Sequence, residues 1–244
     1  MRIVATIEAR MKSSRLPGKV LKPVLGRPLL DLMIERVRRV PQVSEIVVAT
    51  TTDSSCDPIE EMAHKLGVGC FRGSEDDVLD RVLQAARSAR ADLIVELTGD
   101  CPLMDPAIVN QVIETFLAAG VDYCSNTLAR TYPRGMDVQV FPLAVLEEVA
   151  RLTNNPADRE HVSLYIYEHP ERFKLRSVQS DLPASAADLR LTVDTPADFD
   201  LVNQIFEKLY PANPQFALAD ILELFAHEPH LVTLNNDVQQ KAVR

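Results

Sequence analysis

The residues best suited to chemistry in this sequence are four cations within ten positions of its N-terminal segment. They are Arg10, Lys12, Arg15 and Lys19. They follow an apolar, β-branched run at residues 3–7 and share their segment with two serines and a Pro-Gly turn. Ligands of open α/β sheets bind at the carboxyl ends of strands. Backbone N–H groups and cationic side chains can converge there on one anion. The segment therefore predicts a polyphosphate-binding loop; the alternative is a solvated turn with ordinary surface charges.

Two aspartates follow other predicted strands. Asp100 comes after the apolar run at residues 92–97, beside a glycine and a turn-forming proline. A carboxylate there offers the hard oxygen that Mg²⁺ bound to phosphate prefers, although such an aspartate is also a common turn or helix-capping residue. Asp194 follows residues 189–193 and stands before Thr195 and Pro196, which is typical of a helix start. The same pattern leaves Asp198 on the surface.

Composition narrows the class of protein. The chain has 244 residues, of which 46% are hydrophobic, and a formal net charge of −9. Such a charge argues against a nucleic-acid partner and makes the basic segment stand out as an anion site. No run of eighteen apolar residues and no basic-then-apolar leader is found. We therefore expect a cytoplasmic protein without a membrane partner. Four widely separated cysteines without a CxxC pattern predict reduced thiols.

Strand-like and helix-like segments alternate along the first half of the chain. Predicted strands lie at residues 3–7, 45–50, 68–71 and 92–97. Predicted helices lie at residues 29–40, 56–66, 75–89 and 105–119. This alternation indicates βαβ units and a largely parallel sheet. In the second half, wider spacing predicts a mixed sheet. Strands are expected there at 121–125, 136–141, 173–178 and 189–193, and helices at 143–152, 157–169, 197–209 and 216–226. The polar tail from residue 237 is expected to fray.

Ala9-Arg10 followed by Ser-Ser-Arg-Leu-Pro-Gly-Lys at residues 13–19 closely resembles the sugar cytidylyltransferases. These enzymes load acidic sugars such as Kdo and sialic-acid-like nonulosonates onto CMP, and the chain looks most like their spore-coat polysaccharide branch. The resemblance extends to about residue 209. It implies a three-layer α/β sandwich with a mostly parallel mixed central sheet, Rossmann-like and similar to nucleotide-diphospho-sugar transferases. The loop matches neither a GxGxxG dinucleotide fingerprint nor a P-loop.

The resemblance also implies a reaction and its residues. CTP and an acidic sugar would give a CMP-sugar and pyrophosphate for surface polysaccharide or glycan synthesis, with Mg²⁺ on Asp100 and Asp194. The implied catalytic residues are Arg10, Lys19, Asp100 and Asp194. The implied nucleotide contacts are Ala9, Arg10, Ser14, Arg15, Gly18, Lys19, Arg81, Thr98 and Asp100. Kdo enzymes usually carry glutamine and an acid where this chain has Thr98 and Cys101.

Candidate contacts to the acceptor sugar lie in the second half. They are Arg134, Asp137, Gln139, Arg159 and His161. Arg134 suits a substrate carboxylate because its planar fork can donate two parallel hydrogen bonds. Residues 158–161 can equally be read as a helix start with i,i+3 pairs, and His161 as an interior histidine. Near Arg81, Ser74 and Asp77 resemble a capping box at the predicted start of the helix at 75–89.

We predict one domain over residues 1–244. Residues 1–120 would bind nucleotide, 121–210 would hold the sugar and the dimer interface, and 211–244 would form a C-terminal helix and tail. The resemblance implies a homodimer.

Three alternatives to a cytidylyltransferase remain. A sugar-1-phosphate pyrophosphorylase would carry paired glycines in its loop. A glycosyltransferase of the same fold would need a DxD motif, which here, at residues 198–200, falls inside a predicted helix. A binding protein without catalysis would not need Lys19, Asp100 and Asp194.

Overall fold

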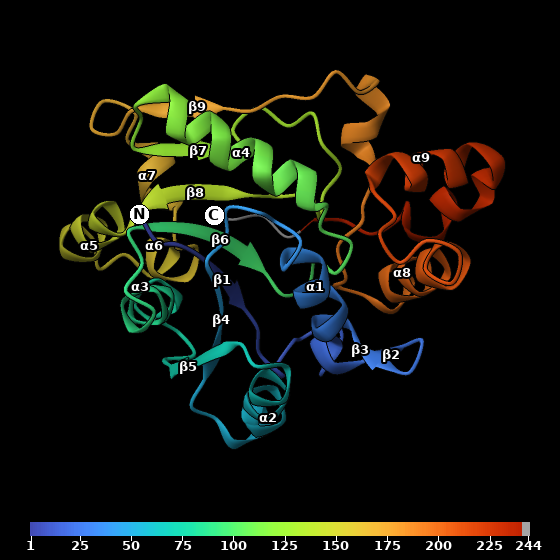
Figure 1. Cartoon of the computed structure of the whole chain (residues 1–244), viewed down its shortest axis with the longest axis horizontal. Helices are drawn as coiled ribbons and strands as arrows, with labels where there is room; N and C mark the ends of the chain where they lie inside the picture. The colour runs from blue at the N-terminus through green and yellow to red at the C-terminus, as the bar shows by residue number, and fades with distance from the viewer. Residues whose placement is uncertain (241–244) are drawn as a thin grey trace.

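The computed structural model describes residues 1–240, and its centre is a seven-stranded sheet (Figure 1). The order of its strands is β5-β4-β1-β6-β8-β7-β9. Neighbouring strands are parallel except around β8, which runs antiparallel to both β6 and β7. The strands are β1 (Ile3–Glu8), β4 (Glu45–Thr51), β5 (Gly69–Gly73), β6 (Leu93–Thr98), β7 (Tyr123–Ser125), β8 (Gln139–Pro142) and β9 (Leu175–Ser177). The predicted mostly parallel, mixed sheet is confirmed.

Helices cover both faces of the sheet, which explains why the central strands read as continuous apolar runs. The helices are α1 (Leu29–Val37), α2 (Asp57–Leu66), α3 (Val78–Ser88), α4 (Pro106–Ala119), α5 (Leu143–Leu152), α6 (Pro156–Glu160), α7 (Leu164–Glu168), α8 (Pro196–Leu209) and α9 (Leu218–His227). One apolar core joins the sheet to α1, α2, α4, α8 and α9. A second core joins the opposite face to α3, α5 and α7. The three-layer sandwich is therefore confirmed.

Smaller elements complete the chain. A hairpin of β2 (Pro23–Val24) and β3 (Arg27–Pro28) precedes α1. Short 3₁₀ turns are η1 (Lys19–Leu21), η2 (Ser54–Cys56), η3 (Ala184–Asp188) and η4 (Pro229–Asn235).

All four cysteines are free thiols. Among residues 1–240 no helix combines the length and apolar character that crossing a membrane requires.

Local sequence explains several element boundaries. Asp105 caps α4 by accepting a hydrogen bond from the Ala107 N–H at 2.8 Å, and Gly120 ends that helix in the left-handed conformation. Thr195 begins α8 in a capping box with Asp198, as its Thr-Pro sequence indicates. The predicted helix at 75–89 starts later than expected. Asp77, rather than Ser74, is the N-cap of α3, and the preceding acids lie outside the helix.

The predicted helix over 157–169 is wrong as a single element. It divides into α6 and α7, and the break falls after Glu160. The break lies at His161, whose backbone leaves the helical conformation with a φ of −112° and a ψ of 54°. Directly after it, residues 162–164 are buried one after another, and the Ser163 hydroxyl donates to the side chain of Gln139 in β8.

Residues 189–193 do not form the predicted strand. Their backbone makes one isolated bridge, between Arg134 and Arg190, instead of a ladder. Leu191 and Val193 are nevertheless buried, which is why the pattern resembles a strand. Asp198 is also misplaced by the sequence prediction, since it is fully buried rather than on the surface. Of the predicted frayed tail, residues 237–240 are described, and residues 241–244 lie outside the described residues.

Candidate active site

The site forms where the carboxyl ends of β1 and β6 lie side by side. Glu8 pairs with Thr98 in the parallel register, and the Gly99 N–H donates to the Glu8 carbonyl at 2.7 Å. A Cβ at Gly99 would lie only 2.7 Å from that same carbonyl oxygen. The glycine therefore lets the loop after β6 fold tightly against the loop after β1. This contact brings residues 9–19 next to Asp100.

The loop after β1 closes on itself before it reaches Lys19. Gly18 has a φ of 69°, a left-handed conformation, and its N–H donates to the Met11 carbonyl at 2.8 Å. A cavity of about 760 Å³ opens over this loop. It is lined by Arg10, Met11, Lys12, Ser13, Ser14, Pro17, Gly18, Ser55 and Glu75. Directly after Gly18, η1 begins and carries Lys19 to the inner side of the loop.

Lys19 lies between the two predicted metal aspartates. Its Nζ donates to Asp100 Oδ2 at 2.8 Å and to Asp194 Oδ1 at 2.7 Å. Burial would lower the pKa of Lys19, but the charges of Asp100 and Asp194 outweigh it and raise that pKa. In the opposite sense, Lys19 overcomes the effect of burial on Asp194 and holds the pKa of that carboxyl below its ordinary value. The site thus holds a compact, charged cluster of one ammonium and two carboxylates.

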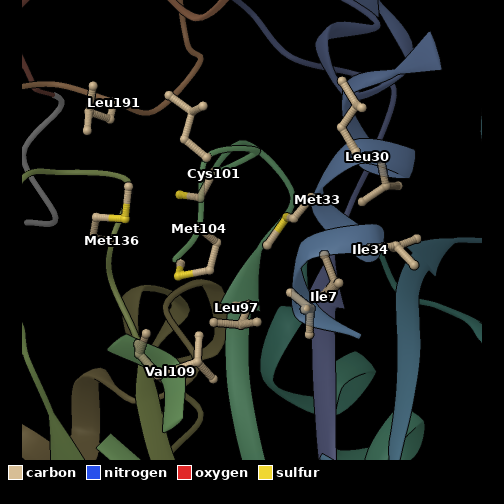
Figure 2. Packing of buried hydrophobic residues seen from close by; sticks show 14 of the residues in the cluster. Ile7, Leu30, Met33, Ile34, Leu97, Cys101, Met104, Val109, Met136 and Leu191 are labelled. Atoms are coloured by element: carbon tan, nitrogen blue, oxygen red, sulfur yellow. The ribbon is translucent and has the colours of Figure 1, made fainter. Parts of the chain in front are cut away.

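Backbone contacts explain how two aspartates far apart in sequence meet. The Asp100 carbonyl accepts hydrogen bonds from the Val193 N–H at 2.8 Å and from the Thr192 hydroxyl at 3.1 Å. Cys101 is buried in the core near Met104 and Leu191, as Figure 2 shows. The core thereby anchors the loop after β6, while the neighbouring Asp100 stays partly exposed.

Apart from Arg81, the remaining predicted nucleotide contacts divide into two groups. Arg10, Ser14 and Arg15 are exposed near the cavity; Arg15 pairs with Asp194 at 3.0 Å and Arg10 lies 3.7 Å from Glu75. Ala9 and Thr98 instead serve the scaffold. The Ala9 N–H donates to the Ala49 carbonyl at 3.2 Å, and the Thr98 hydroxyl contacts the Cys101 sulfur at 3.3 Å.

Arg81 is almost completely buried at the side of the site. Its guanidinium donates to the carbonyls of Ser74 and Glu75 and holds the segment before α3. Its Nε has no hydrogen-bond partner among the described residues. Burial lowers the pKa of Arg81, and the charge of Glu8 partly compensates. In this state the residue supports the wall of the cleft.

The predicted sugar contacts are placed in two locations. Arg134 and Asp137 lie near the Asp194 side, where Asp137 is paired with Arg130 at 2.6 Å. Arg134 forms no ion pair within residues 1–240, and burial followed by the charge of Arg130 lowers its pKa. Among the described residues, no carboxylate therefore lies within ion-pair distance of its guanidinium.

The other three lie toward the face covered by α3 and α6. Gln139 accepts a hydrogen bond from the Tyr123 hydroxyl at 2.5 Å and another from the Ser163 hydroxyl. The Arg159 Nε donates a hydrogen bond to Asp77 Oδ1 at 2.9 Å, and this contact joins α6 to the start of α3. His161 is half-buried at the C-terminal end of α6. These residues do not join Arg134 in one cluster.

Sequence reasoning missed a buried pair of acids beside the site. Glu8 and Glu96 lie on adjacent strands and share a hydrogen bond. Burial raises the pKa of both carboxyls, and Glu96 Oε2 has no partner among the described residues. The signal in the sequence was an acid inside each of two apolar strands, which is costly to bury in the ionised form.

The donor set at Asp100 and Asp194 fits Mg²⁺. Both aspartates direct a carboxylate oxygen at one small cation, the Lys19 ammonium, so their negative charge already converges. Mg²⁺ is usually held by one or two carboxylates and completes its shell with phosphate oxygens and water. Within residues 1–240, no group of three or more His, Cys, Asp or Glu side chains that could hold a metal ion is found.

A cation-rich loop and convergent carboxylates at the carboxyl edge of a mostly parallel sheet define a nucleotide-handling α/β enzyme. Residues 4–226 match the sequence pattern of the cytidylyltransferases. The chain belongs to the cytidylyltransferase family, and the family is one of nucleotidyltransferases.

Three relatives illustrate the match. A cytidylyltransferase structure from Leptospira borgpetersenii superimposes with a TM-score of 0.90 at 33% identity, covering 99% of this chain and 100% of that one. The spore coat polysaccharide biosynthesis protein SpsF of Bacillus subtilis is 31% identical over 95% of this chain and 97% of its own. A 3-deoxy-manno-octulosonate cytidylyltransferase of Trichlorobacter lovleyi is 41% identical over 48% of this chain and 46% of its own.

Proposed function

We propose that this enzyme transfers CMP from CTP to an acidic sugar and releases pyrophosphate, as a step in surface polysaccharide or glycan synthesis. The observation that carries the proposal is the position of Lys19, held between Asp100 and Asp194 beside the cation-rich loop. The names of the Bacillus and Trichlorobacter relatives support polysaccharide synthesis and the use of CTP with an acidic sugar.

The reaction needs little covalent chemistry from the protein. The anomeric hydroxyl of the sugar attacks the α-phosphorus, the bond to the β-phosphate oxygen breaks, and the hydroxyl proton leaves to solvent. Arg10, Arg15 and Lys19 stabilise the charge on the α-phosphate and on the departing pyrophosphate. Positioning and preorganised charge therefore supply most of the rate enhancement. When bound at Asp100 and Asp194, Mg²⁺ supplies further positive charge at the phosphates.

The acceptor is assigned an acidic character because of Arg134. Its guanidinium is half-buried and forms no ion pair in the described part of the chain. A carboxylate on the sugar would fill that position with two charge-assisted hydrogen bonds. The backbone bridge between Arg134 and Arg190 fixes their two segments side by side. A sugar bound at Arg134 would therefore lie on the same side of the site as Asp194. We also expect a homodimer, with its interface in residues 121–180, and a cytoplasmic location.

The proposal is tested by Asp194→Asn, with the exposed neighbour Asp200→Asn as the matched control. We expect pyrophosphate release from CTP to fall by ~100- to 1000-fold in the first variant, because it removes a charge that organises Lys19 and the metal. Asp200→Asn should retain wild-type turnover. Circular dichroism and a thermal melt establish that both variants are folded. Unchanged turnover in folded Asp194→Asn would refute the role assigned to this carboxylate.

A further inference from the structure

The C-terminal turn η4 reaches the back of the proposed active site through one buried side chain. The Asn235 Nδ2 donates to the Arg190 carbonyl at 3.0 Å and to Asp198 Oδ1 at 2.9 Å. Asn235 is buried, although both of its neighbours in the sequence are exposed. It also lies beyond residue 226, where the match to the family pattern ends. A segment outside that pattern therefore contacts residues directly behind Asp194.

Arg190 connects Asn235 to the reacting side of the cleft. Its Nε donates to Asp198 Oδ1 at 2.9 Å, while the other arm of its fork donates to Asp194 Oδ2 at 2.6 Å. Asp198 is fully buried and also accepts the backbone N–H groups of Asp194 at 3.0 Å and Thr195 at 2.9 Å. Both the side chain and the backbone of Asp194 are thus held from behind by this pair.

A buried ion pair keeps one geometry only when its hydrogen bonds are satisfied. Asn235 supplies a donor to Asp198 that no other residue of η4 provides among the described contacts. It also fixes the backbone of Arg190 through the carbonyl. Without these two bonds, the Arg190 fork keeps its contacts with Asp194, Asp198 and Gln240, but the backbone that carries it and the Asp198 carboxylate behind it are less firmly held. Asp194 Oδ2 would then turn toward Arg15, which already lies at 3.0 Å.

We infer that Asn235 is a positioning residue for Asp194, acting through Asp198 and Arg190. The inference rests on the proposed function, because it takes Asp194 as part of the transfer centre. The cations that receive the phosphates come from the N-terminal loop and do not contact Asn235. Loss of the Asn235 amide should therefore misplace Asp194 during the chemical step and leave CTP binding intact. Misplacement of about 1 Å costs up to ~100-fold in rate.

The kinetic test compares three single variants. Asn235→Ala removes the donors, Asn235→Leu keeps the side-chain volume without the donors, and Asn236→Ala changes the exposed neighbour. We expect kcat to fall ~10-fold or more in both Asn235 variants, with the KM for CTP within about twofold of wild type. Asn236→Ala should match wild type. A wild-type kcat in Asn235→Leu would show that the side chain only fills space and would overturn the inference.

A second readout does not depend on turnover. In the nucleotide-free protein, exchange of the Arg190 Nε–H with solvent is followed by NMR. We expect slow exchange in wild type and Asn236→Ala, and exchange at least ~10-fold faster in Asn235→Ala, since the pair with Asp198 loosens. Unchanged exchange would overturn the inference. If Asn235→Ala does not fold, Asn235→Ser is measured in its place. Asn235→Ser retains one donor and should show an intermediate loss of kcat. A wild-type kcat in Asn235→Ser would contradict the inference.

The two proposals can fail separately. Wild-type protein that releases no pyrophosphate from CTP with any acidic sugar would refute the proposed function, while the exchange measurement would still test the link from Asn235 to Arg190. Wild-type release with unchanged kinetics in Asn235→Ala would refute the positioning role alone.

Discussion

The two sides of the proposed active site are built in different ways. The nucleotide side comes mainly from one short loop, residues 9–19. Its cations Arg10 and Lys12 line one cavity, while Arg15 and Lys19 pair with Asp194. The acceptor side is assembled from residues on separate elements, such as Arg134 near Arg190 and Gln139 near Ser163. The cations of the first side are close together in sequence, whereas the acceptor candidates come from separate elements and lie in two locations of the folded chain. Under the proposed function, one loop would carry the affinity for phosphate, while packing between distant segments would set the choice of acceptor.

The largest effect is expected where the two sides meet, at Lys19. Lys19→Ala removes the cation that pairs with both Asp100 and Asp194. We expect kcat/KM for CTP to fall by ~1000-fold, because the variant loses charge stabilisation and leaves two carboxylates facing each other. Lys65→Ala, an exposed lysine of α2, is the matched control and should change kcat/KM by less than about twofold. Steady-state pyrophosphate release measures both. A loss of less than tenfold in Lys19→Ala would place the phosphate-binding centre elsewhere.

A smaller and more selective effect is expected on the acceptor side. Arg134→Ala removes the guanidinium that lacks an ion-pair partner within residues 1–240. Loss of a bidentate, charge-assisted contact of up to ~3 kcal/mol should raise the KM for the acidic sugar by ~100-fold. The KM for CTP should stay within about twofold of wild type. Arg172→Ala, at an exposed pair with Glu148, is the control. If the KM for CTP rises instead, the separation of the two sides is wrong.

The smallest effect concerns stability rather than catalysis. Burial and the neighbouring Glu8 raise the pKa of Glu96 well above its ordinary value of 4.5. The folded protein therefore retains a proton that the unfolded chain releases, and Glu96 costs stability increasingly as pH rises above that ordinary value. Glu96→Gln cannot ionise and should melt at about the wild-type temperature near pH 5 but above the wild-type temperature at pH 8.

Thermal melts between pH 5 and pH 9 measure this difference. Glu61→Gln, at an exposed position of α2, is the control and should follow the wild-type curve. Parallel curves for wild type and Glu96→Gln would mean that the buried acid does not retain its proton in the folded state.

The sequence was sufficient where a local rule determines the structure. Asp105 with Pro106 predicted the start of α4, and Gly120 predicted its end, because caps depend on adjacent residues. The position of Asp100 at the carboxyl edge of the sheet also followed, because this residue comes shortly after the parallel strand β6. These features depend on residue type and order rather than on contacts over long distances.

The sequence was insufficient where packing competes with a local pattern. Asp198 resembles an exposed helix residue, yet it is buried by Arg190, which precedes α8, and by Asn235 from the distant turn η4. Residues 189–193 have the alternation of a strand, but they make only one bridge because they pack against the turn at Gly135. A Cβ at Gly135 would lie 2.5 Å from the Leu191 backbone, an approach that no local pattern indicates. Tertiary contacts decided each of these positions.

The measurement that tests the central claim most directly is pyrophosphate release by the wild-type protein in the presence of Mg²⁺. Each of CTP, UTP, ATP, GTP and dTTP is supplied with a panel of acidic sugars and, separately, with sugar 1-phosphates. We predict release with CTP and one acidic sugar, and none above background with the other nucleotides. Release with UTP or dTTP and a sugar 1-phosphate, without release from CTP, would contradict the account and assign the enzyme to the pyrophosphorylases.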